Sequence, residues 1–144
     1  MDDFVEAITE AKRSLDDYNG GPLAAIGVAN AMANARNAAQ TARKSLADGD
    51  QFTSEEATRC SESYTKMFLI LLDTLQSAKD KAPLFKSMGV GPLAIYMVQN
   101  LHDEKNLFEG VAKTKIPDDV FYQMTPWTDK IGHAFDEAQQ AYRT

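Results

Sequence analysis

Apolar residues recur at intervals of three and four along almost the whole chain, and this spacing constrains the fold more than any other feature. Residues spaced in this way lie on one face of an α-helix, whereas a half-buried strand needs an apolar residue at every second position. Near the amino end the spacing joins Phe4, Ile8, Ala11, Leu15 and Tyr18. No segment shows convincing strand alternation. The spacing therefore predicts an all-α protein.

Glycine and proline divide the chain into successive helices. The segment Asn19-Gly20-Gly21 is predicted to end the first helix, and Pro22 suits the first position of a second helix over 22–47. Ten of the 24 residues over 24–47 are alanine. Small side chains let neighbouring helices approach closely, so we expect tight packing along this helix.

The remaining helices are predicted from similar signals. Thr53 and Glu56 have the spacing of a capping box, which would start a third helix. A fourth is predicted over 92–112, and a fifth from Pro117 that is interrupted at Pro126. The chain is therefore expected to form a bundle of about five helices, some of them broken by proline.

Two ten-residue segments, Gly21–Asn30 and Gly91–Asn100, share six residues. One interpretation is a weak internal repeat with a pseudo-twofold relation, and the other is that two helices simply begin with the same Gly-Pro-Leu-Ala punctuation. In both segments the leucine is predicted to lie in the core, and Asn30 and Asn100 share the helix faces of these leucines. Amides on a buried face would either join two helices or line a polar pocket.

Length and charge limit the range of functions. The 144 residues are enough to bury a core without a metal or a disulfide, so one domain over residues 1–144 is predicted. Lysine and arginine total 15 against 21 aspartate and glutamate, a net charge of −6. Nucleic acid is excluded as a partner because phosphate binding needs a cationic face, and anionic membranes are disfavoured for the same reason.

The cysteine count and the hydropathy pattern predict a cytoplasmic protein. Cys60 is the sole cysteine, so no internal disulfide can form, which favours a reducing compartment. The amino end, MDDFVEAITE, carries acids where a secretory signal carries bases. The most hydrophobic run, over 67–72, is far shorter than the roughly 20 residues that span a bilayer.

No motif predicts catalysis, and we expect no enzyme activity, no cofactor and no metal site. The segment GVGPLA fits Gly-x-Gly-x-x-Ala, but a helix precedes it where a dinucleotide site needs a strand. A di-metal site in a bundle needs Glu-x-x-His, which is missing from the sequence. His133 shares a helix face with Asp129 and Glu137 and is interpreted as a solvated, ion-pairing residue rather than a catalytic one.

By exclusion, the sequence predicts an acidic protein-binding module of the inhibitor, immunity-protein, chaperone or adaptor type. Its negative charge favours a protein partner with a basic face, and a homodimer is left open. The segment over 120–127 concentrates aromatic residues, which are favoured at interfaces although core packing explains them as well. Trp127, Tyr122 and Phe121 are the predicted contact residues.

The alternative prediction is a helical bundle that binds a small apolar or amphipathic ligand in an interhelical cavity. An alanine-rich helix opposite bulky phenylalanine and methionine side chains would leave such a cavity. Asn30, Asn100 and Tyr96 would then be its polar anchors. A cavity of a few hundred Å³ would support this alternative, and a filled core would count against it.

Overall fold

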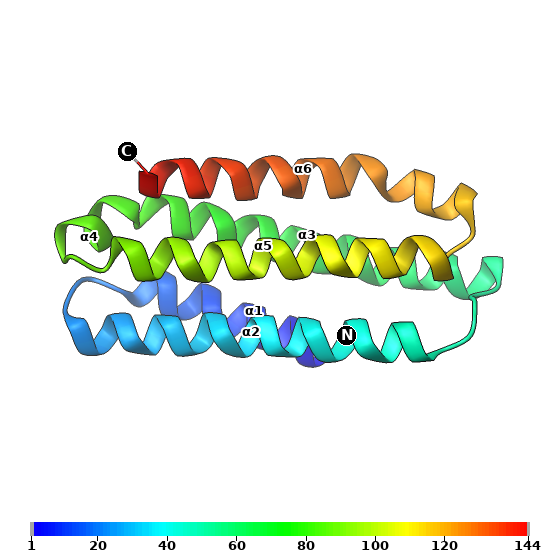
Figure 1. Ribbon diagram of the computed structural model, residues 1–144, viewed down its shortest axis with the longest axis horizontal. Helices are drawn as coiled ribbons and strands as arrows, with labels where there is room; N and C mark the ends of the chain where they lie inside the picture. The colour runs from blue at the N-terminus through cyan, green and yellow to red at the C-terminus, as the bar shows by residue number, and fades with distance from the viewer. Residues whose placement is uncertain (1, 144) are drawn as a thin grey trace.

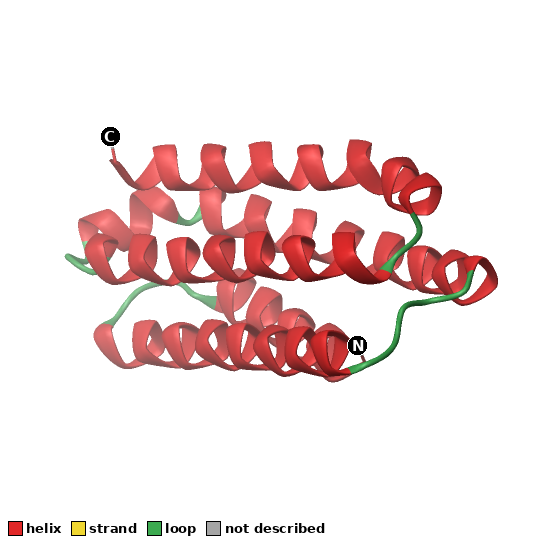
Figure 2. Ribbon diagram, turned by 45° about the vertical axis from the view of Figure 1, so that its right-hand side comes forward, coloured by secondary structure: helices red, strands yellow, loops and turns green. Residues whose placement is uncertain are grey.

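The computed structural model describes residues 2–143, which form helices joined by short connections (Figures 1 and 2). The helices within this range are α1 (Asp2–Asp17), α2 (Pro22–Asp48), α3 (Ser54–Asp80), α4 (Ala82–Ser87), α5 (Gly91–Lys115) and α6 (Asp118–Arg143). The described residues contain no strand, and no helix among them is long and apolar enough to cross a membrane. The prediction of an all-α bundle of about five helices is confirmed, with α4 as an additional short helix.

The capping residues and prolines that were predicted to start helices do so in the structure. The Thr53 hydroxyl accepts a hydrogen bond from the Glu56 amide at 3.2 Å, and the Glu56 carboxylate accepts one from the Thr53 amide at 3.1 Å. This capping box satisfies two amides at the start of α3. Pro22 lies in the first turn of α2, and Pro83 lies in the first turn of α4. Proline is tolerated there because first-turn amides have no partner within the helix.

The predicted interruption at Pro126 is wrong, because α6 continues through this residue. Proline in a helix removes the hydrogen bond to the carbonyl four residues earlier, here that of Tyr122. Both Pro126 and Tyr122 lie on the exposed side of α6, with Tyr122 79% exposed. Water can therefore satisfy the freed carbonyl, and the apolar face on the other side holds the helix together.

The five long helices form a closed ring around one apolar core. Around this ring α1 contacts α2, α2 contacts α5, α5 contacts α6, α6 contacts α3, and α3 contacts α1 (Figure 1). The short α4 packs against α3, α5 and α6 at one end. Five helices around a common axis cannot all touch at the centre, so large side chains have to fill the middle.

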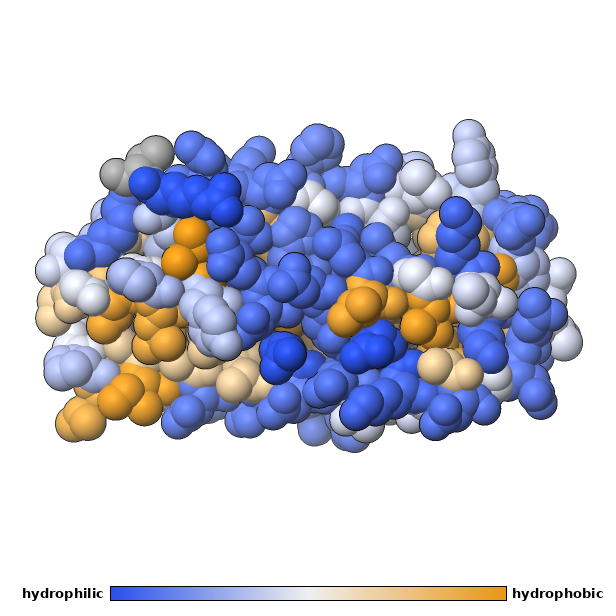
Figure 3. All heavy atoms as spheres, viewed as in Figure 1, coloured by the Kyte–Doolittle hydropathy of each residue, from blue (hydrophilic) through white to orange (hydrophobic). Residues whose placement is uncertain are grey.

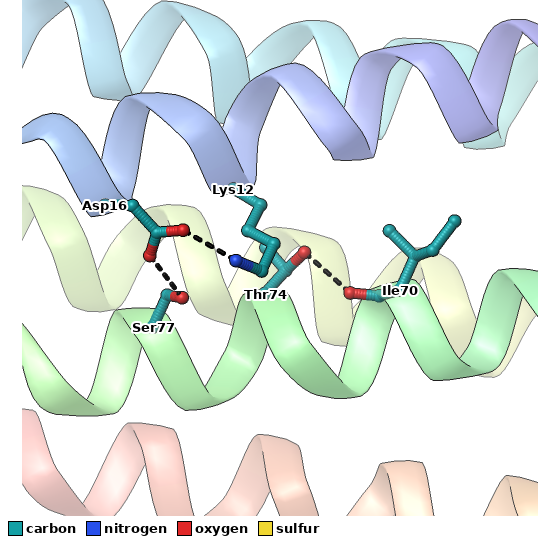
Figure 4. Close-up of polar contacts among 5 residues, drawn as sticks. All are labelled: Lys12, Asp16, Ile70, Thr74 and Ser77. Carbon is teal, nitrogen blue, oxygen red and sulfur yellow. Dashed lines mark hydrogen bonds and ion pairs between the residues drawn. The ribbon is translucent and has the colours of Figure 1, made fainter.

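One side-chain hydrogen bond between Ser77 and Asp16 joins α3 to α1, and further polar contacts within each helix lie beside it (Figure 4). Asp16 on α1 accepts hydrogen bonds from Lys12 and from Ser77 of α3, both at 2.6 Å. These two bonds, that of Lys12 first, hold the pKa of Asp16 below its ordinary value. The fully buried Thr74 hydroxyl donates to the Ile70 carbonyl at 2.8 Å. The polar atoms of this seam thus have partners, as buried polar groups need.

The segments Gly21–Asn30 and Gly91–Asn100 begin two neighbouring helices. Figure 1 shows α2 and α5 starting at the same end of the bundle and running side by side in the same direction. The expectation that their leucines lie in the core is wrong, because Leu23 is 83% exposed and Leu93 is 38% exposed. The buried face of α2 includes Val28, which lies about 200° around the helix from Asn30.

Candidate functional site

An apolar cleft lies between the first halves of α2 and α5, and we call it the α2–α5 cleft. All six described helices contribute to its lining, which consists of Leu15, Ala25, Val28, Ala29, Met32, Ala78, Phe85, Val90, Leu93, Ala94, Met97, Val98 and Tyr142. Its free volume is about 20 Å³, about the space that one water molecule needs. The cleft is therefore nearly filled by its own side chains, and its walls are apolar apart from one tyrosine hydroxyl.

A second apolar space, the central void, lies further along the ring axis. Side chains of all five long helices surround it, and its apolar lining is Phe4, Ala39, Met67, Phe68, Leu71, Leu101, Phe108, Ala112, Phe121, Met124 and Phe135. Lys105, Glu109 and Thr128 complete the lining. The free volume is about 50 Å³. The α2–α5 cleft and the central void are thus small gaps between packed apolar side chains.

Among the described residues, the polar contacts that tie the two walls of the α2–α5 cleft together lie beyond its far end. Arg43 on α2 donates to the Glu104 carboxylate on α5 at 2.7 Å, and Glu104 is only 3% exposed. The Lys115 ammonium donates to the Gly49 carbonyl at 2.6 Å, and the Phe52 amide donates to the Lys115 carbonyl at 2.8 Å. Over residues 22–42, no hydrogen bond or ion pair of the described chain joins α2 to α5. The first halves of these helices are held by apolar contact alone.

Two polar side chains, the buried Tyr142 of α6 and the half-buried His102 of α5, have hydrogen-bond partners where α6 packs on its neighbours. The Tyr142 hydroxyl donates to the Ala78 carbonyl at 2.7 Å, and burial raises the pKa of this tyrosine, which stays neutral. The His102 ring stacks on Phe135 at 4.7 Å between ring centroids, and its Nδ1 lies 2.9 Å from Gln139 Nε2. Burial, and then the charge of Lys105, lower the pKa of His102. A neutral imidazole is therefore favoured, and it can accept the amide hydrogen of Gln139.

The predicted protein-contact residues do not form one exposed aromatic surface. Tyr122 is 79% exposed. Phe121 is partly buried and lines the central void, and Trp127 packs partly buried against the core. The Lys130 ammonium lies 5.6 Å from the Trp127 ring, a cation–π contact.

The predicted ligand anchors and the catalytic candidate lie away from the interior. Asn30 is exposed in a surface groove between α1 and α2, and Tyr96 is 56% exposed. Asn100 is partly buried, but none of the three lines the α2–α5 cleft or the central void. His133 is exposed, which removes the basis for a catalytic site around it. Sequence reasoning did not identify the residues that line the α2–α5 cleft and the central void. The high alanine content of α2 was the one signal that indicated space beside this helix.

Apolar side chains are exposed around the mouth of the α2–α5 cleft. Figure 3 shows apolar surface gathered over the end of the bundle where α2 and α5 begin. Leu23 is 83%, Ile26 53% and Met88 44% exposed, and Leu93 both lines the cleft and reaches the surface. We call Leu23, Ile26, Met88 and Leu93 the apolar rim. Apolar side chains exposed together at one end of a protein point to an interaction site.

Solved structures of helical ligand-binding domains have the same fold. Ligand-binding domain 1 of the Penicillium marneffei MP1 protein, complexed with arachidonic acids, matches with a TM-score of 0.92 at 15% identity, covering 98% of this chain and 92% of that chain. Domain 2 of that protein, with multiple arachidonic acids, matches at 0.92 and 17% identity, covering 98% and 90%. AFMP4P in complex with palmitic acid matches at 0.92 and 15%, covering 96% and 92%. A comparison with curated proteins found no match.

These findings correct the predicted function. A family model described as hydrophobic surface binding protein A matches residues 1–113. The names of this family and of the solved structures concern hydrophobic surfaces and fatty acids, and they describe binding rather than catalysis. The prediction of an inhibitor or adaptor with a basic-faced protein partner is therefore wrong. The sequence argued against catalysis and against binding of nucleic acid, but it left the kind of ligand open. No residue pattern in it distinguished a protein that binds another protein from one that binds an apolar molecule. The family model covers residues 1–113 of the 144, well over half of the chain. The chain belongs to the hydrophobic surface binding protein A family.

Proposed function

We propose that this protein binds a long-chain apolar or amphipathic molecule of the fatty acid class inside its ring of helices. The observation that carries the proposal is the pair of apolar spaces, the α2–α5 cleft and the central void, along one ring axis. The likeness in fold to domains solved with arachidonic acid and palmitic acid supports this ligand class. Burial of an acyl chain contributes about 0.8 kcal/mol per methylene, which is a sufficient driving force.

Binding requires the ring to open, because the two spaces are too small as they stand. Sites for molecules of this size enclose about 300–1,000 Å³, against about 20 and 50 Å³ here. The first halves of α2 and α5 can separate without breaking a polar contact, whereas their far ends are tied by Arg43 and Glu104. Gly21 and Gly89, both at positive φ, precede the two helices and give the chain freedom to turn there.

Palmitic acid is the probe that tests this function. Added to delipidated protein, it is expected to raise the midpoint of thermal unfolding in a concentration-dependent way, because a ligand that binds only the folded state stabilises that state. Isothermal titration calorimetry would give the dissociation constant. Absence of both the thermal shift and the binding heat would rule out the proposed function.

Filling the cleft is expected to weaken palmitic acid binding. In Ala29→Phe a large ring takes the space in the α2–α5 cleft that the acyl chain would occupy, and accommodating both would cost the complex about 1–3 kcal/mol of overpacking. The dissociation constant should therefore rise by roughly five- to a hundredfold. Ala24→Phe is the matched control, because Ala24 is exposed on the same helix and does not line the cleft. If the two variants changed the dissociation constant equally, palmitic acid would not bind in the α2–α5 cleft.

Attachment to a hydrophobic surface is a second candidate function, and the exposed apolar rim favours it. The family description names this kind of binding. Replacing Leu23 and Ile26 together by aspartate puts two charges where 83% and 53% exposed apolar side chains stand. We expect the double variant to lose adsorption to polystyrene beads, measured by depletion from solution, while it still binds palmitic acid. Unchanged adsorption would exclude the rim as the contact surface.

A further inference from the structure

We propose that Lys105 is the carboxylate-binding group of the interior site. On ligand entry its ammonium would exchange the Glu109 carboxylate for the carboxylate of a long-chain acid. The acid's apolar tail would then run from the central void toward the α2–α5 cleft. This inference rests on the proposed function and adds to it the orientation of the ligand and a preference for acids.

Lys105 has the position that such a group needs. Its side chain lines the central void and is 13% exposed. Its ammonium lies close to α6 at Gly132, where a Cβ atom would be 3.5 Å from Nζ. Among the residues that line the central void, Lys105 and Glu109 are the ionisable ones, and the other polar residue is Thr128. The surface that faces this void is apolar as the protein stands, so Lys105 contributes its aliphatic stem there, and its ammonium would reach a bound carboxylate by turning away from Glu109.

The existing pair between Lys105 and Glu109 is poorly satisfied, which makes exchange feasible. Lys105 Nζ lies 2.8 Å from Glu109 Oε1, but this buried oxygen accepts no hydrogen bond of good direction in the described chain. Buried polar atoms ordinarily have such a partner. The Glu109 side chain is 26% exposed, so it can turn into water when another carboxylate takes its place. One carboxylate would replace another, and the ammonium would stay paired.

The alternative places for a carboxylate are less suitable. The α2–α5 cleft has no charged residue in its lining, and the Tyr142 hydroxyl there already donates to the Ala78 carbonyl. The Arg43 guanidinium is paired with the buried Glu104. Burial of a carboxylate without a partner is costly, and the net charge of −6 adds general repulsion. A specific internal cation is therefore needed for an acid to be preferred over its neutral analogue.

The test compares an acid with a neutral molecule of the same chain length. Dissociation constants of palmitic acid and methyl palmitate are measured by calorimetry for the wild-type protein and for Lys105→Met, which keeps most of the apolar stem. We expect the wild type to prefer the acid. Lys105→Met should weaken acid binding by about tenfold to a hundredfold and leave ester binding within about twofold, because a charge-assisted hydrogen bond is lost only with the acid.

Three further variants make the test specific. Glu109→Gln should tighten acid binding a few-fold, because the competing carboxylate is removed. Lys105→Arg should retain the preference for the acid. Lys113→Met changes the same charge at an exposed position of α5 and should leave both constants unaltered. Equal weakening of acid and ester by Lys105→Met, or no weakening of either, would overturn the inference, whereas absence of binding of both ligands to the wild type would overturn the proposed function itself.

Discussion

Replacing Arg43 by methionine is expected to lower the free energy of unfolding by about 3–5 kcal/mol. Arg43 is the partner of Glu104, whose side chain is only 3% exposed between α2 and α5. Without the guanidinium, a carboxylate would remain in the core with no opposite charge. Loss of one member of a buried pair is costly for this reason, although the intact pair itself contributes little net stability. Urea unfolding followed by far-ultraviolet circular dichroism measures the change.

The double variant Arg43→Met, Glu104→Met separates the unpaired charge from other effects. Replacing a buried ion pair by apolar side chains of similar size is often neutral or stabilising, so the double variant should recover most of the lost stability. If Arg43→Met costs less than about 1 kcal/mol, Glu104 must be reached by water, and α2 and α5 would not be tied at this point. This pair is the main polar link between the two helices, so it also bears on how the ring opens.

Replacing Phe135 by alanine is expected to cost about 3–5 kcal/mol, because the ring is fully buried and its removal leaves a cavity. Phe135 also stacks on His102, with ring planes only 1° from parallel. The new cavity would join the central void, which Phe135 lines. An apolar cavity of this kind stays dry and accepts apolar ligands. Palmitic acid should therefore raise the midpoint of thermal unfolding more for Phe135→Ala than for the wild type.

Ile131→Ala is the matched control for that experiment. Ile131 is also fully buried on α6, but it lines neither the α2–α5 cleft nor the central void. Its replacement should cost about 2–5 kcal/mol and leave the stabilisation by palmitic acid as in the wild type. Differential scanning fluorimetry with and without ligand gives both quantities. The same ligand effect in the two variants would show that the acyl chain does not reach the central void.

The positions of the helices could be predicted because they depend on neighbours in sequence. The capping box of Thr53 and Glu56 and the first-turn Pro22 act within one turn of helix, so their effect does not need the rest of the fold. Pro126 is the exception. Whether a proline ends a helix depends on whether the freed carbonyl meets water or apolar side chains, and the tertiary structure decides that.

The lining of the interior could not be predicted in the same way. Leu23 and Asn30 were expected on a core face, but helical spacing says only that they share a face, not which face is covered. Lys105 and Glu109 are four residues apart, the spacing of an ordinary surface pair. Only the packing of α6 beside α5 places this pair at an otherwise apolar void.

By itself, the sequence determined an acidic, all-helical bundle with its helix starts and its alanine-rich second helix, because periodicity, caps and composition act locally. The tertiary structure decided that α2 and α5 run side by side, that their leucines face outward, and that two apolar spaces lie within the ring. The physical reason is that burial belongs to contacts between helices. A residue becomes part of an interior site only when other helices close around it.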